Sequence, residues 1–257
     1  MAALLVAEAV MLPVTELVRK GKGATQPVVA AGQPWPITAP AVSAALLGGL
    51  RALVADGLWL RTYLAWADGD LPATERLIRL VTTVDDRPIC FWLNGARIMA
   101  NDMPQWRLAR ERRGGGAAQR DKRIVEEQAR AALTYLAEGG RRHPESAAIC
   151  VETANIHLYR RGDLVAAAEW YRRAAALPAA PYYAARIHGE LLRRLGRPRE
   201  AYAWLCRLHP TLPRGDPEAM SEVVLGRIRD LENELNLSDD ERYMTPPDCT
   251  NVRNRER

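Results

Sequence analysis

Histidine and cysteine are the residue types in this sequence best suited to metal binding or nucleophilic catalysis, and both are scattered. No HExxH pair or GxSxG nucleophile motif accompanies a histidine, and the four are His143, His157, His188 and His209. No CxxC pair or Cys/His cluster occurs, and the four cysteines are Cys90, Cys150, Cys206 and Cys249. We therefore expect no metal site and no redox-active pair, and we interpret most of these side chains as parts of helix cores.

Paired carboxylates and a glycine run are the other patterns with chemical potential. Glycosidase-type hydrolysis needs two carboxylates held across a cleft, but Asp85–Asp86, Glu126–Glu127 and Asp239–Glu241 fall at expected helix ends or solvated faces. Gly114–Gly116 follows two arginines but lacks the GxxxxGK[ST] spacing of a phosphate loop. The sequence thus predicts no catalytic residue and no cofactor, which favours a non-enzymatic function. An enzyme whose site the sequence hides remains an alternative.

The composition is typical of a helical protein. Apolar residues make up 48% of the 257 residues, and alanine, leucine and arginine, which cost least in a helix interior, dominate. A single phenylalanine and few runs of β-branched residues argue against long strands. The net charge of +5 permits contact with acidic proteins, anionic lipid or nucleic acid without requiring any of them.

An internal repeat specifies how the helices are organised. Gly162 and Gly196 are 34 residues apart, and the same spacing relates four further pairs: Leu158 and Leu192, Ala167 and Ala201, Glu169 and Ala203, Tyr171 and Leu205. A glycine can end a helix in the left-handed conformation, since it has no Cβ. A small alanine then lets the second helix approach the first, and a large residue four positions later fills the gap between them.

On these residues, the segments 158–178 and 192–210 resemble tetratricopeptide repeats, whose period is 34 residues. The resemblance implies an all-α fold in which antiparallel helix-turn-helix repeats stack as a short right-handed solenoid. Weaker copies occupy 58–88, where Asp70 can cap a helix, and 89–144. A last helix over 217–236, with Asp216 as its cap and Pro217 in its first turn, is interpreted as the capping helix that such an array needs.

These assignments divide the chain into three parts. Residues 1–40 are expected to form an apolar helix and a Gly/Pro-rich linker, and residues 237–257 a polar tail. The repeat domain covers 41–236, with an insertion at about 102–120 that is expected to be a loop. Residues 1–20 make a poor secretory signal and are too short and too charged for a membrane span, but an amphipathic helix there would allow membrane association. The expected location is cytoplasmic or membrane-associated.

The stretch 46–61 is similar to a motif in bacterial tetratricopeptide proteins that follows an N-terminal membrane anchor. The matching residues are Gly48, Gly49, Arg51, Asp56, Leu58 and Trp59. This resemblance implies a non-enzymatic scaffold in a bacterial assembly near a membrane.

The expected partner is a peptide or helix of another protein. In tetratricopeptide domains the first helix of each pair lines a concave groove, chiefly through its positions 2, 5, 9 and 12. Beside Ile149, those positions hold Glu152, Ile156, Tyr159, Tyr183, Arg186, Glu190 and Arg193. Arg186, Glu190 and Arg193 share one helix face, and such a polar stripe would be costly inside a core. We predict that this face is exposed and binds the partner.

Two further surfaces are candidates for binding. The first is a docking surface around the first repeat: Arg51, Asp56, Trp59, Tyr63 and Trp92. Its charges can instead form a structural ion pair and its tryptophans can belong to the core. The second is the stretch 107–123, whose seven basic residues (Arg107, Arg110, Arg112, Arg113, Arg120, Lys122 and Arg123) outnumber two acidic ones. Nucleic-acid binding there is the alternative function, although the stretch has only one neighbouring aromatic residue, Trp106.

Overall fold

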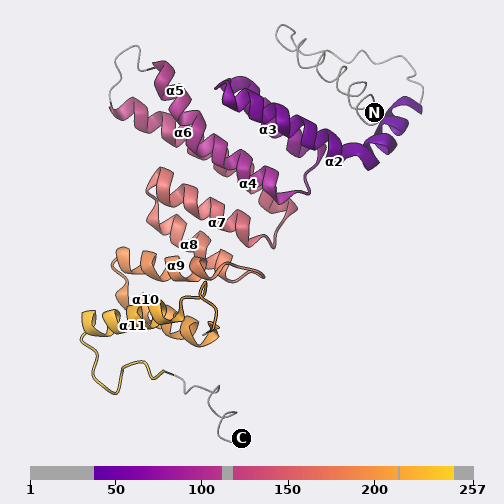
Figure 1. Ribbon diagram of the computed structural model, residues 1–257. Coiled ribbons are helices and arrows are strands. Elements are labelled where there is room, and N and C mark those ends of the chain that lie inside the picture. Colours follow the sequence, from indigo (N-terminus) through magenta and orange to yellow (C-terminus); the bar gives the residue numbers. More distant parts are fainter. Residues whose placement is uncertain (1–37, 112–117, 214, 246–257) are drawn as a thin grey trace, which may run out of the picture. The chain divides into compact units, whose positions relative to one another are not determined.

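The computed structural model describes residues 38–111, 118–213 and 215–245 (Figure 1). The chain divides into two compact units, Met1–Gly49 and Leu50–Arg257. The contacts discussed below all lie within the second unit. The expected helix at 1–20, most of the linker and the last twelve residues lie outside the described residues.

Helices account for nearly all of the regular structure in the described residues, which contain no strand. The α-helices are α2 (Thr38–Ala67), α3 (Leu71–Val84), α4 (Ile89–Arg97), α5 (Met103–Glu111), α6 (Ala118–Arg142), α7 (Ala147–Ile156), α8 (Leu164–Ala175), α9 (Tyr182–Arg194), α10 (Pro198–Leu208) and α11 (Ser221–Glu234). Two π-helical turns, η1 (Ile98–Asp102) and η3 (His157–Arg161), extend α4 and α7, and a short 3₁₀ turn, η4 (His209–Thr211), follows α10.

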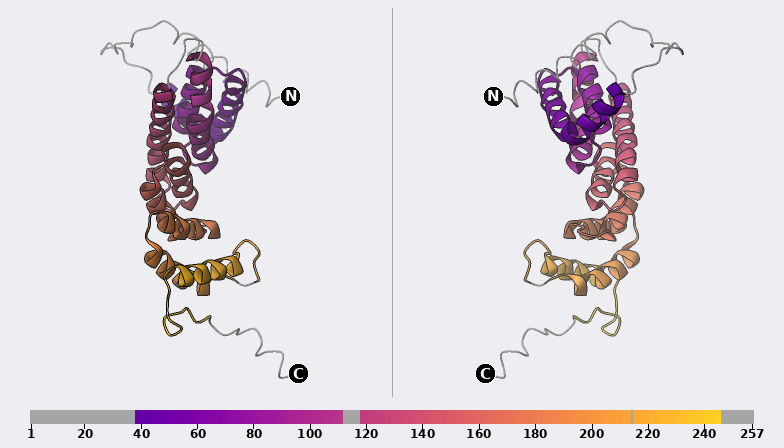
Figure 2. Two further views of the ribbon diagram at one scale, coloured as in Figure 1. Left: turned by 90° about the vertical axis from the view of Figure 1, so that its left-hand side faces the viewer. Right: turned by 90° about the vertical axis from the view of Figure 1, so that its right-hand side faces the viewer.

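Each helix packs mainly against the helices next to it in the chain. The closest pairs run in order through α7, α8, α9, α10 and α11, and α4 packs against α6 (Figure 2). Three apolar clusters follow one another along this array, and they include Tyr135, Tyr171 and Leu205 respectively. The described chain is an all-α helical repeat solenoid, which confirms the predicted fold class.

The repeat residues take the positions that their types predict. Gly162 and Gly196 adopt left-handed φ angles of 65° and 72° directly after their helices. Ala167 and Ala201 are fully buried, where they let neighbouring helices approach closely. The Asp70 carboxylate accepts a hydrogen bond from the Ala73 amide at 3.1 Å and so caps α3 as expected.

The loop expected over 102–120 is wrong for most of that range. The first helix of this unit continues from α4 through η1 into α5, and α6 begins at Ala118. The reason is that buried apolar residues continue beyond the expected end of the helix at residue 100, since Met103 and Leu108 lie in the core. In addition, the π turn at η1 departs from the α-helical spacing of 3.6 residues per turn, so buried residues before and after it do not follow one α-helical periodicity. Within the range 102–120, only residues 112–117, which include Gly114–Gly116, lie outside the described residues.

The expected start of the capping helix is also wrong. Asp216 accepts a hydrogen bond from the Glu218 amide at 2.9 Å within a turn, and α11 begins only at Ser221, after Met220 in a left-handed conformation. The Arg186 guanidinium donates to the carbonyl oxygens of Glu218 and Ala219 at 2.8 Å each. Since those oxygens are engaged by a side chain, the start of the helix is displaced by four residues.

Candidate partner-binding face

The first helices of the pairs that follow α2 and α3 are α4 with η1, α7 with η3, and α9, and we consider the surface that they and the capping helix α11 contribute. We call this surface the first-helix face. Two hollows open on it: the C-terminal hollow between α9 and α11, and the N-terminal hollow between η1 and the α7–η3 helix. Their volumes are about 410 and 300 Å³.

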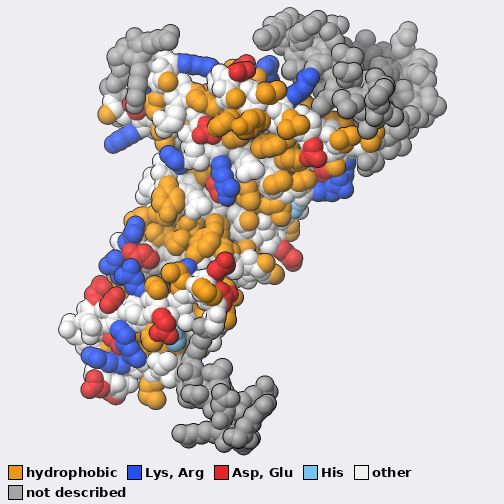
Figure 3. All heavy atoms as spheres, in the orientation of Figure 1, with side chains coloured by type: hydrophobic (Ala, Val, Ile, Leu, Met, Phe, Trp, Pro, Cys, Tyr) orange, Lys and Arg blue, Asp and Glu red, His pale blue; other side chains and the backbone are white. Residues whose placement is uncertain are grey.

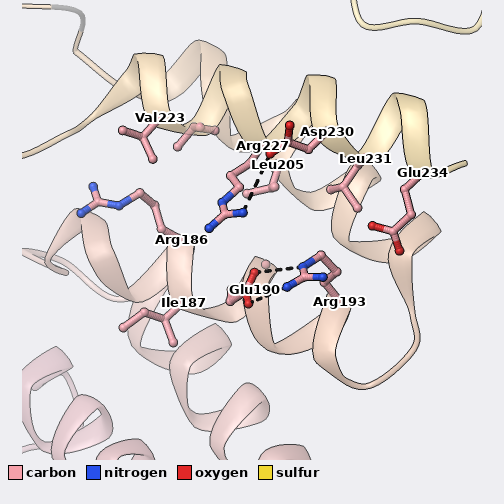
Figure 4. A pocket seen from close by; sticks show the side chains of 12 residues that line it. Arg186, Ile187, Glu190, Arg193, Leu205, Val223, Arg227, Asp230, Leu231 and Glu234 are labelled. Carbon is pink, nitrogen blue, oxygen red and sulfur yellow. Dashed lines mark hydrogen bonds and ion pairs between the residues drawn. The ribbon is translucent and has the colours of Figure 1, made fainter.

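The C-terminal hollow has an apolar floor and charged rims. Ile187 of α9, Leu205 of α10 and Leu231 of α11 lie at its base (Figure 4). The rim on α9 carries the polar stripe that was predicted to bind the partner, and the rim on α11 carries a second row of charged side chains. The rim residues are Arg186, Glu190, Arg193, Arg227, Asp230 and Glu234. The structure therefore brings together three of the residues predicted to line the groove.

A close approach between α9 and α10 sets the depth of this floor. Gly189 faces α10, and a Cβ at that position would lie 2.8 Å from a methyl carbon of Leu205. Such a distance is shorter than van der Waals contact allows, so only glycine lets the two helices meet here without displacing Leu205. Val223, at 49% exposure, remains open at the α11 side of the hollow.

The rim charges of the C-terminal hollow are largely satisfied within the protein. Glu190 accepts hydrogen bonds from Arg193 at 3.1 Å and from Arg194 at 3.0 Å, and these arginines lower the pKa of its carboxyl group. Arg227 lies 3.9 Å from Asp230. Burial lowers the pKa of Arg186, which is held by two backbone carbonyls. Over this end of the array, basic and acidic side chains are interspersed (Figure 3).

The N-terminal hollow is more polar. The buried Glu152 carboxylate accepts a hydrogen bond from Arg97 at 2.9 Å, and the side-chain Oδ1 of Asn155 accepts one from the Tyr171 hydroxyl at 2.5 Å. Arg160 and Asn101 also line this hollow, and their side chains make no hydrogen bond or ion pair with the described residues. The hollow thus presents side-chain donors that are free to bind a ligand.

Exposed tyrosines accompany these donors. Tyr159 of η3 is 68% exposed and Tyr183 of α9 is 42% exposed. Burial raises the pKa of Tyr171, and the phenols of Tyr159 and Tyr183 act in the same direction. The three tyrosines therefore belong to one neighbourhood, and two of them offer aromatic surface to a ligand.

Two of the predicted groove residues are less accessible than the repeat positions implied. Ile156 is 2% exposed and Glu152 is 5% exposed, so both line the N-terminal hollow largely from within the core. Sequence reasoning missed Arg97, Asn101, Asn155 and Arg160. Asn155 lies three residues from Glu152, so the helix periodicity indicates that it shares that face. Asn101 lies between the end of the expected helix at residue 100 and the insertion expected at about 102–120, so no helix periodicity could place it.

The predicted docking surface separates into a buried and an exposed part. Arg51 lies 3.9 Å from the buried Asp85, whose pKa is lowered to about 2 chiefly by hydrogen bonding with Arg87. Trp92 is 4% exposed and packs on Tyr135, with 4.7 Å between ring centroids, while Trp59 is half-buried against Phe91. Asp56 and Tyr63 remain exposed on α2.

The described part of the basic stretch 107–123 is helical, and several of its charges are engaged. Arg107 and Arg123 both pair with Glu127, at 3.0 and 3.6 Å. Arg110 donates to the Gly69 carbonyl oxygen at 2.6 Å. Arg112 and Arg113 lie outside the described residues.

The isolated histidines have structural contacts. His188 is buried, its Nδ1 lies 2.8 Å from the Ala168 carbonyl oxygen, and burial lowers its pKa. Among the described residues, no three histidine, cysteine or acidic side chains are grouped as a metal site would require. Within the same residues, no helix has the length and apolar character needed to span a membrane.

Comparison with known proteins adds no assignment to this geometry. No protein-family model matches the chain, and no curated protein sequence matches it.

Proposed function

We propose that this protein is a non-enzymatic scaffold that binds a peptide or helix of a partner protein along its first-helix face. One observation carries the proposal: Arg186, Glu190 and Arg193, predicted as a binding stripe, line a hollow of about 410 Å³ with an apolar floor. An apolar base with charged rims suits an amphipathic segment, whose apolar side chains enter the hollow while its polar side chains meet the rims.

The N-terminal hollow supports the same proposal from the other end of the face. A ligand crossing both hollows would bury Tyr159 and Tyr183, and aromatic side chains of this kind supply much of the binding energy at protein interfaces. Arg160 would pair with a carboxylate of the ligand. Both hollows are open and lie between helices, as expected for a polypeptide ligand.

We further propose that the array is of the tetratricopeptide type and serves a bacterial assembly at or near a membrane. The 34-residue period, the left-handed glycines at 162 and 196 and the buried alanines at 167 and 201 support the first part. The resemblance of 46–61 to anchored bacterial proteins supports the second. Nucleic-acid binding through 107–123 is less well supported, because Arg107 and Arg123 already pair with Glu127.

Selection from a displayed random-peptide library tests the binding proposal without knowledge of the partner. The full chain would be the bait, and enriched peptides would be titrated against the wild type and Val223→Glu, which places a charge in the C-terminal hollow. We expect binding to weaken at least about tenfold in the variant, since an apolar contact is replaced by a charge.

The matched control is Val165→Glu, because Val165 is 64% exposed on α8, outside both hollows. This variant should bind like the wild type. Failure to enrich any peptide, or equal losses in the two variants, would reject the first-helix face as the binding surface. Binding of nucleic acid with a steep salt dependence would favour the alternative function instead.

A further inference from the structure

Among the residues whose burial the structure describes, the largest group of exposed apolar side chains outside the hollows lies on α2. Four large apolar side chains there are each more than half exposed: Leu53 at 54%, Leu60 at 67%, Tyr63 at 62% and Leu64 at 63%. The opposite side of the same helix is buried, with Ala55, Leu58 and Thr62 at 1% or less. A helix that is apolar on both sides is normally covered on both.

The two ends of the array differ in this respect. α11 ends the array with charged residues exposed outside the hollow, including Glu222 and Arg229. Such a surface is suited to water and does not match an apolar face. Head-to-tail association of α2 with α11 is therefore disfavoured, and pairing of α2 with an identical apolar face is the symmetric alternative.

The pattern on α2 is complementary to itself under a two-fold rotation. Leu53, Leu60 and Leu64 share one side of the helix, since they are separated by seven and four residues. If two copies of α2 cross antiparallel near residue 59, Leu53 of one copy meets Leu64 of the other, and the two Leu60 side chains meet at the axis. Each leucine is then covered by a leucine.

The polar residue on the flank of this face fits the same arrangement. Asp56 and Tyr63 are both exposed and lie seven residues apart on one flank. In an antiparallel pair, equivalent flanks face each other, so Asp56 of one copy lies opposite Tyr63 of the second copy. The phenol hydroxyl can then donate to the carboxylate, which keeps that charge satisfied at the edge of the interface.

From these observations we infer that two copies of this chain associate through the exposed face of α2, antiparallel about a two-fold axis near residue 59. This interface lies on α2, which contributes no residue to either hollow, and the inference does not depend on the function proposed for them. A dimer of this kind presents two first-helix faces, so that a partner with two binding segments is held with an increased effective concentration.

Sedimentation of the full chain over a concentration series tests the inference. The wild type should sediment as a dimer at micromolar concentration, and Leu60→Glu should be a monomer with an unchanged far-ultraviolet circular dichroism spectrum, because Leu60 is an exposed side chain. Val165→Glu is the matched control and should remain dimeric. A wild type that is monomeric at every concentration overturns the inference, as does a Leu60→Glu variant that remains dimeric.

Cross-linking gives a second readout that does not depend on a disruptive substitution. In a background with all four cysteines replaced by serine, Leu60→Cys should form a disulfide-linked dimer on mild oxidation, since the two Cβ atoms meet at the axis. Val165→Cys should remain uncrosslinked. Absence of the Leu60→Cys dimer, or equal cross-linking at both positions, contradicts the arrangement.

Co-flotation of a monomeric wild type with anionic lipid vesicles, lost in Leu60→Glu, would assign the face to a membrane surface and reject the dimer.

Discussion

The two hollows of the first-helix face differ in how their polar groups are satisfied. In the C-terminal hollow Glu190 and Arg193 pair with each other and Arg186 is held by backbone carbonyls above an apolar floor. In the N-terminal hollow Arg160 and Asn101 have no side-chain partner among the described residues. The first hollow is therefore suited to burying apolar surface, and the second to hydrogen bonding and charge pairing.

This difference indicates that two regions of one helical surface can bind a ligand by different physical mechanisms. Burial of apolar groups supplies affinity that depends little on salt, whereas an exposed guanidinium supplies affinity that salt weakens. A ligand that spans both hollows would combine an apolar segment with an acidic one. The following predictions test this division, beginning with the largest expected effect.

Truncation of the floor should destabilise the C-terminal end of the array most. Leu205 is 5% exposed and packs against Gly189, so Leu205→Ala removes buried contacts and leaves a cavity. We expect a loss of about 2–4 kcal/mol in the free energy of unfolding, measured by urea denaturation. Leu208→Ala, at a half-buried position on the same helix, is the control and should cost less. Equal losses would contradict the assignment of Leu205 to a close-packed floor.

Removal of the arginine that pairs with the buried carboxylate of the N-terminal hollow should lower the stability of the folded protein. Arg97→Ala leaves Glu152, whose side chain is 7% exposed, without its ion-pair partner. We expect the free energy of unfolding to fall by about 2 kcal/mol, which is less than for a fully buried pair because Arg97 is half exposed. The double variant Arg97→Ala/Glu152→Gln should recover part of that loss in the same denaturation experiment. No recovery would show that the ion pair contributes little.

Charge changes in the two hollows should affect binding in different ways. Arg160→Gln should weaken a selected ligand by about tenfold at low salt and much less at high salt, because a charge pair is lost. Val223→Glu should weaken the same ligand at both salt concentrations. Fluorescence anisotropy titrations at 50 and 500 mM salt, about 14 and 4 Å in screening length, make this comparison. Identical salt responses in the two variants would remove the distinction between the hollows.

The smallest expected effect concerns the pH dependence of stability. The arginines beside Glu190 lower the pKa of its carboxyl group below the ordinary value of 4.5, so the pair stabilises the folded chain above that pH. This contribution is lost as the pH falls through the lowered pKa. Glu190→Gln should cost about 0.5 kcal/mol at pH 7, and the difference from the wild type should vanish at low pH. A difference that grows on acidification would contradict the sign of the shift.

The sequence was most informative where regular helices carry the repeat. The spacing of Gly162 and Gly196, with the alanines that follow them, was sufficient to predict α7 to α10 and the face that holds Arg186, Glu190 and Arg193. It failed after η1, where the helix continues through a π turn into α5, beyond the end expected at residue 100.

The second wall of the C-terminal hollow could not be predicted for a different reason. Its residues lie on α11, whose sequence does not continue the 34-residue pattern of turn glycine and small alanine and therefore indicates only a capping helix. The displaced start of α11 depends on a contact from Arg186 to carbonyl oxygens some thirty residues away. A tertiary contact of this kind leaves no local sequence pattern.

Site-specific photo-cross-linking tests the central proposal most directly. A photoreactive phenylalanine analogue would replace Val223, Tyr159 or Val165 in turn, and each protein would be irradiated with the same selected ligand. The account predicts cross-links from positions 223 and 159, in the two hollows, and none from 165 on α8. Cross-links from position 165, with none from the two hollows, would show that the partner binds elsewhere and that the first-helix face is not the functional surface.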